Sequence, residues 1–317
     1  MGGPVKLSDK ELGAYVTEKL ALPGDERNDY RGQVNRLLDK LDHVLATDGS
    51  YRIVKFRRAG SLEKGTSNRP RAGKPADADV GVYFGVDDPD DFDVAALQRL
   101  IKKLLVAAYP QKSPDDFEEG GRTFGVAFNG SGLEVDLVPI VALDSMADFG
   151  LQYSRTGAPV KTSVKAHIAH YRDHAGRDPL LAELLRLAKR WRYWQELAGI
   201  QSFQLELMLS YLVDRDGPAT GLEEGLRRFF LFVARDLDAG IAFDGADASA
   251  FSDAIVIVDP ANEENNVAAR VEPGEREAFV AAAKEALTTI TVAQGLPGKG
   301  ETITAWKELF GENFSID

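Results

Sequence analysis

The sequence predicts an α/β protein in which a mixed sheet with flanking helices precedes a mostly helical half. Before residue 160, three short segments alternate apolar and polar residues as strands do, and helical patterns accompany them. After Pro159, five consecutive segments carry apolar residues at helical spacing. We therefore expect two packed lobes, residues 1–160 and 161–317, with a cleft between them.

The elements are predicted in chain order from these patterns. Residues 8–46 predict two helices, or one long helix interrupted near Pro23 and Gly24. Residues 51–58, 79–84 and 133–138 predict strands, and residues 94–109 predict a helix that lies across their sheet. In the second half, helices are predicted at 163–174, 179–197, 203–213, 223–237 and 274–289.

Composition excludes several classes of function. The 317 residues include no cysteine, which rules out disulfides, thiolate catalysis, iron–sulfur clusters and Cys-based zinc sites. Lysine and arginine total 38 against 50 acidic residues, and a net charge of −12 repels a nucleic-acid backbone, so long nucleic acid is not an expected partner. The sequence contains neither an apolar stretch of membrane-helix length nor an N-terminal secretory signal. We expect a cytoplasmic protein with no membrane partner.

Three aspartates are the strongest candidates for a site. Asp77 and Asp79 lie two residues apart in an extended segment, so both carboxylates project from one face of a strand. Asp136 alternates in the same way with apolar neighbours in the later segment LEVDLV. If the two strands are neighbours, three carboxylates converge, and hard oxygen ligands without His or Cys favour Mg²⁺, with Mn²⁺ as an alternative. Two such ions can activate a hydroxyl and stabilise a leaving pyrophosphate.

A candidate phosphate-binding turn comes directly after the first predicted strand. Gly60, Ser61 and Lys64 belong to the segment AGSLEKGTS, whose backbone N–H groups and hydroxyls suit a β- or γ-phosphate. The surrounding segment, residues 57–74, carries six basic residues against one acidic residue. This basic island in an acidic chain is either part of a phosphate site or an ordinary solvated loop.

The order of these motifs resembles the polymerase-β-like nucleotidyltransferase superfamily: a strand, then GS and KGTS, then DAD, then a distant VDLVP. The whole chain is more narrowly similar to a bacterial cGAS/DncV-like nucleotidyltransferase with an oligoadenylate-synthetase-like C-terminal domain. Segments LAKRW, QSFQLEL and DPANEENNV carry that narrower likeness, although Glu264 stands where the last segment often has proline. The resemblance implies a polymerase-β-like palm packed against the helical lobe.

The resemblance also implies roles for particular residues. Asp77, Asp79 and Asp136 would be catalytic and would hold two Mg²⁺ ions, with Gly60 and Ser61 on the β- and γ-phosphates. Lys189, in LAKRW, would reach the triphosphate, and Ser202 and Phe203, in QSFQLEL, would contact phosphate and base. Ser202 also has the position of a helix N-cap, and Phe203 also fits a core position.

The implied function is synthesis of a cyclic di- or oligonucleotide second messenger in bacterial anti-phage defence. The hydroxyl of one nucleotide would attack the α-phosphate of a nucleoside triphosphate, ATP or also UTP, GTP or CTP, and release pyrophosphate. Accessory or effector proteins of the defence system are expected as partners. Three alternatives stay open: a nucleotidyltransferase acting on RNA, one acting on a small molecule, and a catalytically inactive nucleotide-binding module.

Overall fold

A computed structural model describes residues 7–48, 52–71, 74–86, 94–120, 123–143, 148–153 and 158–316. The chain forms two compact units, one from Leu22 to Ala169 and one that combines Met1–Ala21 with His170–Asp317. We call them the sheet unit and the helical unit and describe each by itself. The domain division at residue 160 and the cleft stay predictions.

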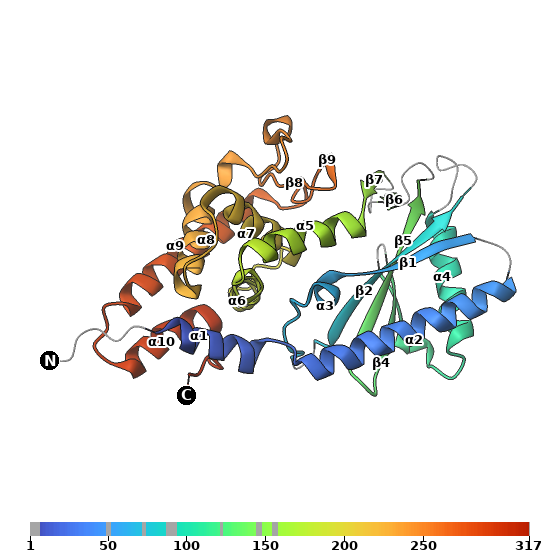
Figure 1. Cartoon of the computed structure of the whole chain (residues 1–317), viewed down its shortest axis with the longest axis horizontal. Helices are drawn as coiled ribbons and strands as arrows, with labels where there is room; N and C mark the ends of the chain where they lie inside the picture. The colour runs from blue at the N-terminus through green and yellow to red at the C-terminus, as the bar shows by residue number, and fades with distance from the viewer. Residues whose placement is uncertain are drawn as a thin grey trace. The chain divides into compact units, whose positions relative to one another are not determined.

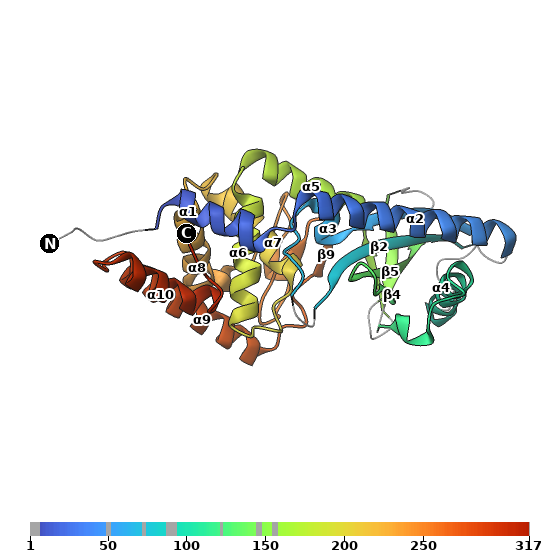
Figure 2. The ribbon, with the colours of Figure 1, turned by 90° about the horizontal axis from the view of Figure 1, so that it is seen from below.

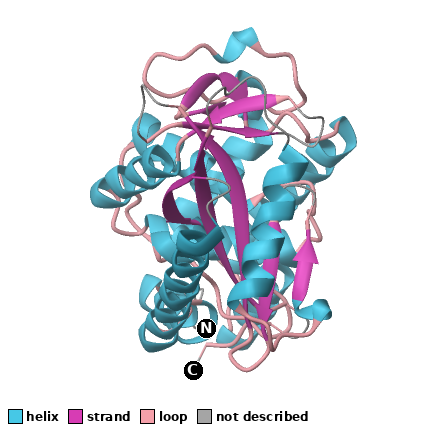
Figure 3. Ribbon diagram, turned by 90° about the vertical axis from the view of Figure 1, so that its right-hand side faces the viewer, coloured by secondary structure: helices cyan, strands magenta, loops and turns pink. Residues whose placement is uncertain are grey.

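The sheet unit is built on one mixed sheet, whose strands are drawn in magenta in Figure 3. Its main path runs β1-β2-β5-β4-β3, and β6 joins β5 to β7. Strands β2 and β5 are parallel, whereas the other pairs are antiparallel. The strands are β1 (Arg52–Ala59), β2 (Ala76–Gly85), β3 (Phe117–Glu119), β4 (Phe124–Phe128), β5 (Leu133–Ala142), β6 (Gly150–Tyr153) and β7 (Pro159–Thr162).

Two helices cover one face of this sheet. Helices α2 (Gly24–Asp48) and α4 (Val94–Ala108) pack their apolar residues against it, and Figure 1 shows both beside the strands. From β2, this face receives Ala78, Val80 and Val82, each at most 3% exposed. Because side chains alternate along a strand, Asp77 and Asp79 project from the opposite face.

The helical unit surrounds a separate core rich in aromatic side chains, including Trp191, Phe229, Phe230 and Phe279. Helices α9 and α10 lie side by side in it (Figure 2). Helix α5 (Val164–Arg177) begins in the sheet unit and ends in this one. The other elements are α1 (Asp9–Tyr15), α6 (Leu181–Trp194), α7 (Ser202–Asp216), α8 (Leu222–Arg235), β8 (Val258–Asp259), β9 (Asn262–Asn266), α9 (Pro273–Ala293) and α10 (Lys299–Phe310).

The predicted strands and helices are confirmed, and the structure adds elements that were not predicted, among them β3, β4, β6, β8 and β9. The first helical region is interrupted by a π-helical turn, Val16–Leu20, and resumes at Gly24. The sheet continues past Pro159, because β7 pairs with β6 where only helices were predicted. Helix α10 was not predicted. Within the described residues, no helix combines the length and apolar character needed to cross a membrane.

Candidate active site

The three aspartates come together on the sheet unit. Strand β2 pairs with β5 in parallel so that Asp79 lies directly opposite Asp136, and Asp77 precedes Asp79 on the same face. One carboxylate oxygen from each residue lies within 4.8 Å of the other two. Asp77 is exposed and the other two are partly buried. The prediction that two neighbouring strands bring these carboxylates together is therefore confirmed.

Local packing explains why the carboxylates hold these positions. In β5, Val135 and Leu137 are fully buried on either side of Asp136, so the alternation forces its side chain onto the other face. Gly125 of β4 is the register partner of Asp136. A Cβ at Gly125 would lie 2.9 Å from Asp136 Oδ1, so this glycine leaves room for the carboxylate. The sequence pattern alone did not indicate Gly125.

The carboxyl group of Asp136 has a strongly shifted pKa. Its pKa is raised to about 6, chiefly because partial burial disfavours the charged form. A hydrogen bond donated by Thr123 acts in the opposite direction. Repulsion from three neighbouring carboxylates adds to the rise: Asp77, Glu118 and Glu134. Neighbouring carboxylates therefore repel Asp136 at this site.

The pairing of the strands explains why two glutamates, Glu118 and Glu134, lie near Asp136. Glu134 precedes Asp136 by two residues and so shares its face, while Glu118 comes from β3. Burial, and then the charges of Glu118 and Asp77, raise the pKa of Glu134 as well. The period-two pattern of LEVDLV could have indicated Glu134, but nothing in the sequence placed the short strand β3 beside it.

The turn after β1 approaches the carboxylates closely. Gly60 begins the short helix α3 (Gly60–Lys64) with φ +67°, a left-handed conformation that favours glycine. A Cβ at Gly60 would lie 1.9 Å from Asp79 Oδ2. Ser61 follows, with its Oγ 3.0 Å from the Oγ of Ser67. Gly60 therefore lies against Asp79, and the phosphate contacts of Gly60 and Ser61 stay predictions.

Helix α3 is held from both sides. Leu62 is 4% exposed and belongs to the core of the sheet unit. Arg31 of α2 donates hydrogen bonds to the carbonyl oxygens of Leu62 and Glu63, at 3.0 and 2.8 Å. Lys64 is the last residue of α3 and is partly buried. The sequence gives no signal for Arg31, because a single arginine on a helix face has no distinctive spacing.

Three predicted contacts belong to the helical unit. Lys189 lies on α6 and is partly buried. Phe203 packs against the core of this unit while staying partly exposed. Ser202 is the first residue of α7, and the N-cap is Gln201, which forms a capping box with Gln204, so the capping prediction for Ser202 is wrong. The nucleotide contacts of Lys189, Ser202 and Phe203 stay predictions.

The chemistry of the carboxylate cluster fits divalent magnesium. The donors are carboxylate oxygens, which Mg²⁺ prefers, and the charge of Asp77 adds to burial in raising the pKa of Asp136. A divalent ion would offset that charge. Asp77, Asp79 and Asp136 are the residues that would hold it.

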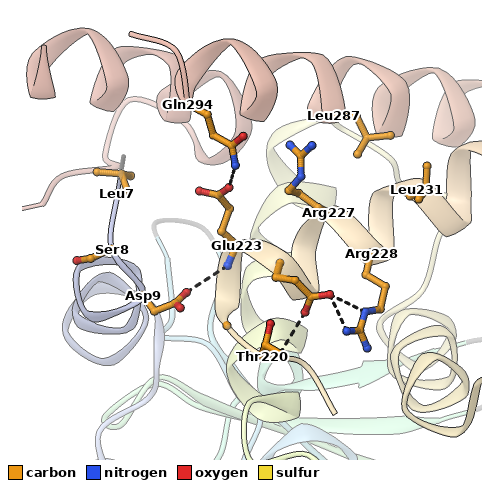
Figure 4. Close-up of a pocket in the computed structure, with 12 residues that line it drawn as sticks. Leu7, Ser8, Asp9, Thr220, Glu223, Arg227, Arg228, Leu231, Leu287 and Gln294 are labelled. Atoms are coloured by element: carbon orange, nitrogen blue, oxygen red, sulfur yellow. Dashed lines mark hydrogen bonds and ion pairs between the residues drawn. The ribbon is translucent and has the colours of Figure 1, made fainter. Parts of the chain in front are cut away.

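A pocket of about 690 Å³ opens in the helical unit between α1, α8 and α9 (Figure 4). None of its lining residues is one of the predicted site residues. Several polar groups of its lining engage one another: Arg228 pairs with Glu224 at 2.6 Å, and Gln294 donates to Glu223. The figure shows these contacts on the pocket wall. The pocket therefore adds nothing to the carboxylate site.

Comparison with known proteins identifies the family. No family model matches the chain. The chain is 32% identical over 314 residues to the CBASS oligonucleotide cyclase CdnC of Escherichia coli strain KTE188, covering 98% of both sequences. The chain belongs to the CBASS oligonucleotide cyclases. It is also 31% identical over 321 residues to the cyclic AMP-AMP-AMP synthase of E. coli strain MS 115-1, covering 96% of this chain and 97% of that one.

Solved structures agree with this assignment. E. coli MS115-1 CdnC with ATP superposes with a TM-score of 0.85 at 31% identity, covering 98% of this chain and 99% of that one. The Vibrio cholerae DncV cyclic AMP-GMP synthase with a linear intermediate gives 0.72 at 14% identity over 96% of both, which supports the fold alone. The chain therefore has the predicted polymerase-β-like fold and is a nucleotidyltransferase of the CBASS oligonucleotide cyclase family.

Proposed function

We propose that this chain joins nucleoside triphosphates into a cyclic oligonucleotide that acts as a second messenger in bacterial anti-phage defence. The observation that carries the proposal is the parallel pairing of β2 with β5, which sets Asp79 opposite Asp136 and completes a three-carboxylate cluster. The CBASS oligonucleotide cyclase relatives, which align over nearly the whole chain, support the same activity. A cytoplasmic location, where nucleotides are abundant, is part of this proposal.

We assign the chemistry to the sheet unit as follows. Asp77, Asp79 and Asp136 would hold two Mg²⁺ ions, which would supply charge neutralisation for the triphosphate and lower the pKa of the attacking hydroxyl. Gly60 and Ser61 orient the β- and γ-phosphates beside Asp79. Asp136 would favour loss of the acceptor hydroxyl's proton to water through the ion that it helps to hold. The hydroxyl oxygen then bonds to the α-phosphorus as the bond to pyrophosphate breaks.

We also keep the predicted contacts of Lys64, Lys189, Ser202 and Phe203 as part of the proposal. Lys64 and Lys189 would neutralise phosphate oxygens, and Ser202 and Phe203 would contact phosphate and base. Among the nucleotides, ATP is the first to test, because one relative is a cyclic AMP-AMP-AMP synthase and another was solved with ATP. A CdnC relative was solved in complex with a HORMA protein, which supports an accessory protein of that kind as a partner.

The purified full chain tests the proposal with Mg²⁺ and all four ribonucleoside triphosphates, alone and with an added HORMA protein. We expect a phosphatase-resistant cyclic product, identified by mass spectrometry. Asp77→Asn combined with Asp79→Asn should abolish it. The control is Asp39→Asn with Asp42→Asn, which removes the same two charges from exposed positions of α2. Equal product from the Asp77/Asp79 variant would reject the site.

Other products would indicate the alternative functions. Label transferred to RNA would indicate an RNA-directed nucleotidyltransferase. An adenylylated small molecule would indicate a small-molecule nucleotidyltransferase, such as an antibiotic adenylyltransferase. Tight binding of triphosphate without turnover would indicate an inactive binding module. Each of these results would replace the proposed function.

A further inference from the structure

Three cationic side chains of the sheet unit gather around one carboxylate, Asp148. Lys55 Nζ lies 3.4 Å from Asp148 Oδ1, and Arg57 Nη2 lies 2.7 Å from the same oxygen. Lys165, from the first turn of α5, pairs with Oδ2. Within the part of the chain that the structure describes, the ion pairs of this group set three positive charges against one negative charge. We call these four residues the Asp148 cluster.

The cluster lies on the sheet face that carries the catalytic aspartates. In the antiparallel pair of β1 and β2, Ala59 is opposite Asp79, Arg57 is opposite Gly81 and Lys55 is opposite Tyr83. Residues opposite one another, and residues two apart, share a face. The Lys55 ammonium indeed stands 4.6 Å from the centre of the Tyr83 ring. Arg57 is therefore roughly 7 Å along the sheet from the level of Asp79.

Stability does not explain three cations around a single carboxylate. One carboxylate balances one cation, and the other two repel each other. Partly exposed ion pairs contribute only about 0–1 kcal/mol each. The Arg57 and Lys165 side chains are 40% and 60% exposed, so an anion from solution can reach them. Among the ion pairs of the described residues, the cluster thus has more positive than negative charge, and one side of it is accessible.

The framework of the cluster is fixed before any ligand arrives. The backbone N–H of Val164 donates to the Tyr83 hydroxyl at 3.3 Å, which ties the start of α5 to β2. Ser163 Oγ donates to the carbonyl oxygen of Asp148 at 2.8 Å. Such pre-organisation lowers the entropy lost when a ligand binds.

The proposed reaction needs a second place for phosphate charge. Every bond formed before ring closure joins a donor triphosphate to an acceptor that carries a 5′-triphosphate of its own, and this second negative group needs cations outside the carboxylate site. We propose that Lys55, Arg57 and Lys165 bind the 5′-triphosphate of the acceptor nucleotide or linear intermediate, and that Asp148 holds them together until it arrives. This inference rests on the proposed function and adds the subsite that selects the acceptor.

The test compares two acceptors that differ only in this group. A linear dinucleotide with a 5′-triphosphate and the same dinucleotide with a 5′-hydroxyl are each elongated with the donor that the chain uses. Arg57→Gln with Lys165→Gln should raise KM for the triphosphorylated acceptor at least about tenfold, as loss of charge-assisted contacts does. KM for the hydroxyl acceptor should change less than about twofold. The control, Arg36→Gln with Lys40→Gln, removes two charges from exposed positions of α2, on the other face.

A second variant should change KM for the triphosphorylated acceptor in the opposite direction. Asp148→Asn removes the competing anion, so KM for the triphosphorylated acceptor should fall about threefold, whereas a purely structural ion-pair cluster predicts a rise or no change. Equal effects on both acceptors, or none, would overturn this inference while leaving the proposed function intact. A wild-type chain that elongates neither acceptor would overturn both.

Discussion

Replacing Gly60 by alanine tests the close approach between the α3 turn and the carboxylates. The new Cβ would lie 1.9 Å from Asp79 Oδ2 and 2.9 Å from its Cγ. Ordinary carbon–oxygen contact is more than 3 Å, so the carboxylate must shift by roughly 1 Å, and a displacement of that size in a catalytic group costs about 100-fold in rate. We expect Gly60→Ala to lower kcat by about that factor.

The same substitution also strains the backbone, and this effect has to be separated. At φ +67°, alanine costs about 1 kcal/mol of stability, or roughly 2–4 °C in Tm. Gly132 provides the matched control, because its φ is +68° and a Cβ there would meet nothing within 4 Å. Gly132→Ala should therefore lose a similar amount of Tm and retain its activity.

The assay is the initial rate of pyrophosphate release at saturating triphosphate and Mg²⁺, below the Tm of every variant. Thermal unfolding of the same samples gives the stability difference. If Gly60→Ala and Gly132→Ala lose activity equally, strain alone accounts for the loss. If Gly60→Ala keeps full activity, the position of Asp79 does not limit catalysis, and the close approach of Gly60 to Asp79 is not required.

The remaining predictions concern Asp136. Because its folded pKa, about 6, lies above the ordinary value of 3.8, the carboxylate destabilises the metal-free fold above pH 6, and this cost disappears as the pH falls toward 4. Asp136→Asn should therefore raise the free energy of unfolding of the metal-free protein by roughly 1–3 kcal/mol at pH 8 and hardly at all at pH 4. Urea unfolding measures this difference. An equal gain at both pH values would contradict the raised pKa of Asp136. Mg²⁺ affinity should weaken as the pH falls through 6, with proton release on binding at pH 6 but not at pH 8, measured by calorimetry in two buffers. Thr123→Val should raise the pKa of Asp136 further and Glu118→Gln should lower it, observed by NMR titration of the carboxyl; shifts of the same sign would refute the stated causes.

Much of the candidate site could be predicted from sequence, because its central feature is periodic. Alternation in DADV and LEVDLV assigns each aspartate to a face without any knowledge of the fold. What the period cannot supply is pairing between distant short strands. Strand β3 has three residues and β4 has five, so Glu118 and Gly125 carried no signal of their nearness to Asp136.

The partners of the basic side chains in residues 57–74 could not be predicted from the sequence either. The composition of this segment left open either a phosphate site or a solvated loop. In the structure, Arg57 pairs with Asp148, and Arg58 pairs with Glu63 at 3.3 Å and donates to Asn35. These partners come from far along the chain or from the next turn, and charge counting does not identify them.

The parallel pairing of β2 with β5 has a consequence for biosynthesis. A ribosome makes Asp77 and Asp79 well before Asp136, and the intervening segment contributes α4, β3 and β4. Contacts between distant segments form late, since the entropy of closing the loop is lost first. A truncated or half-made chain thus lacks the third carboxylate. A nascent polypeptide therefore makes no second messenger until β5 has paired with β2.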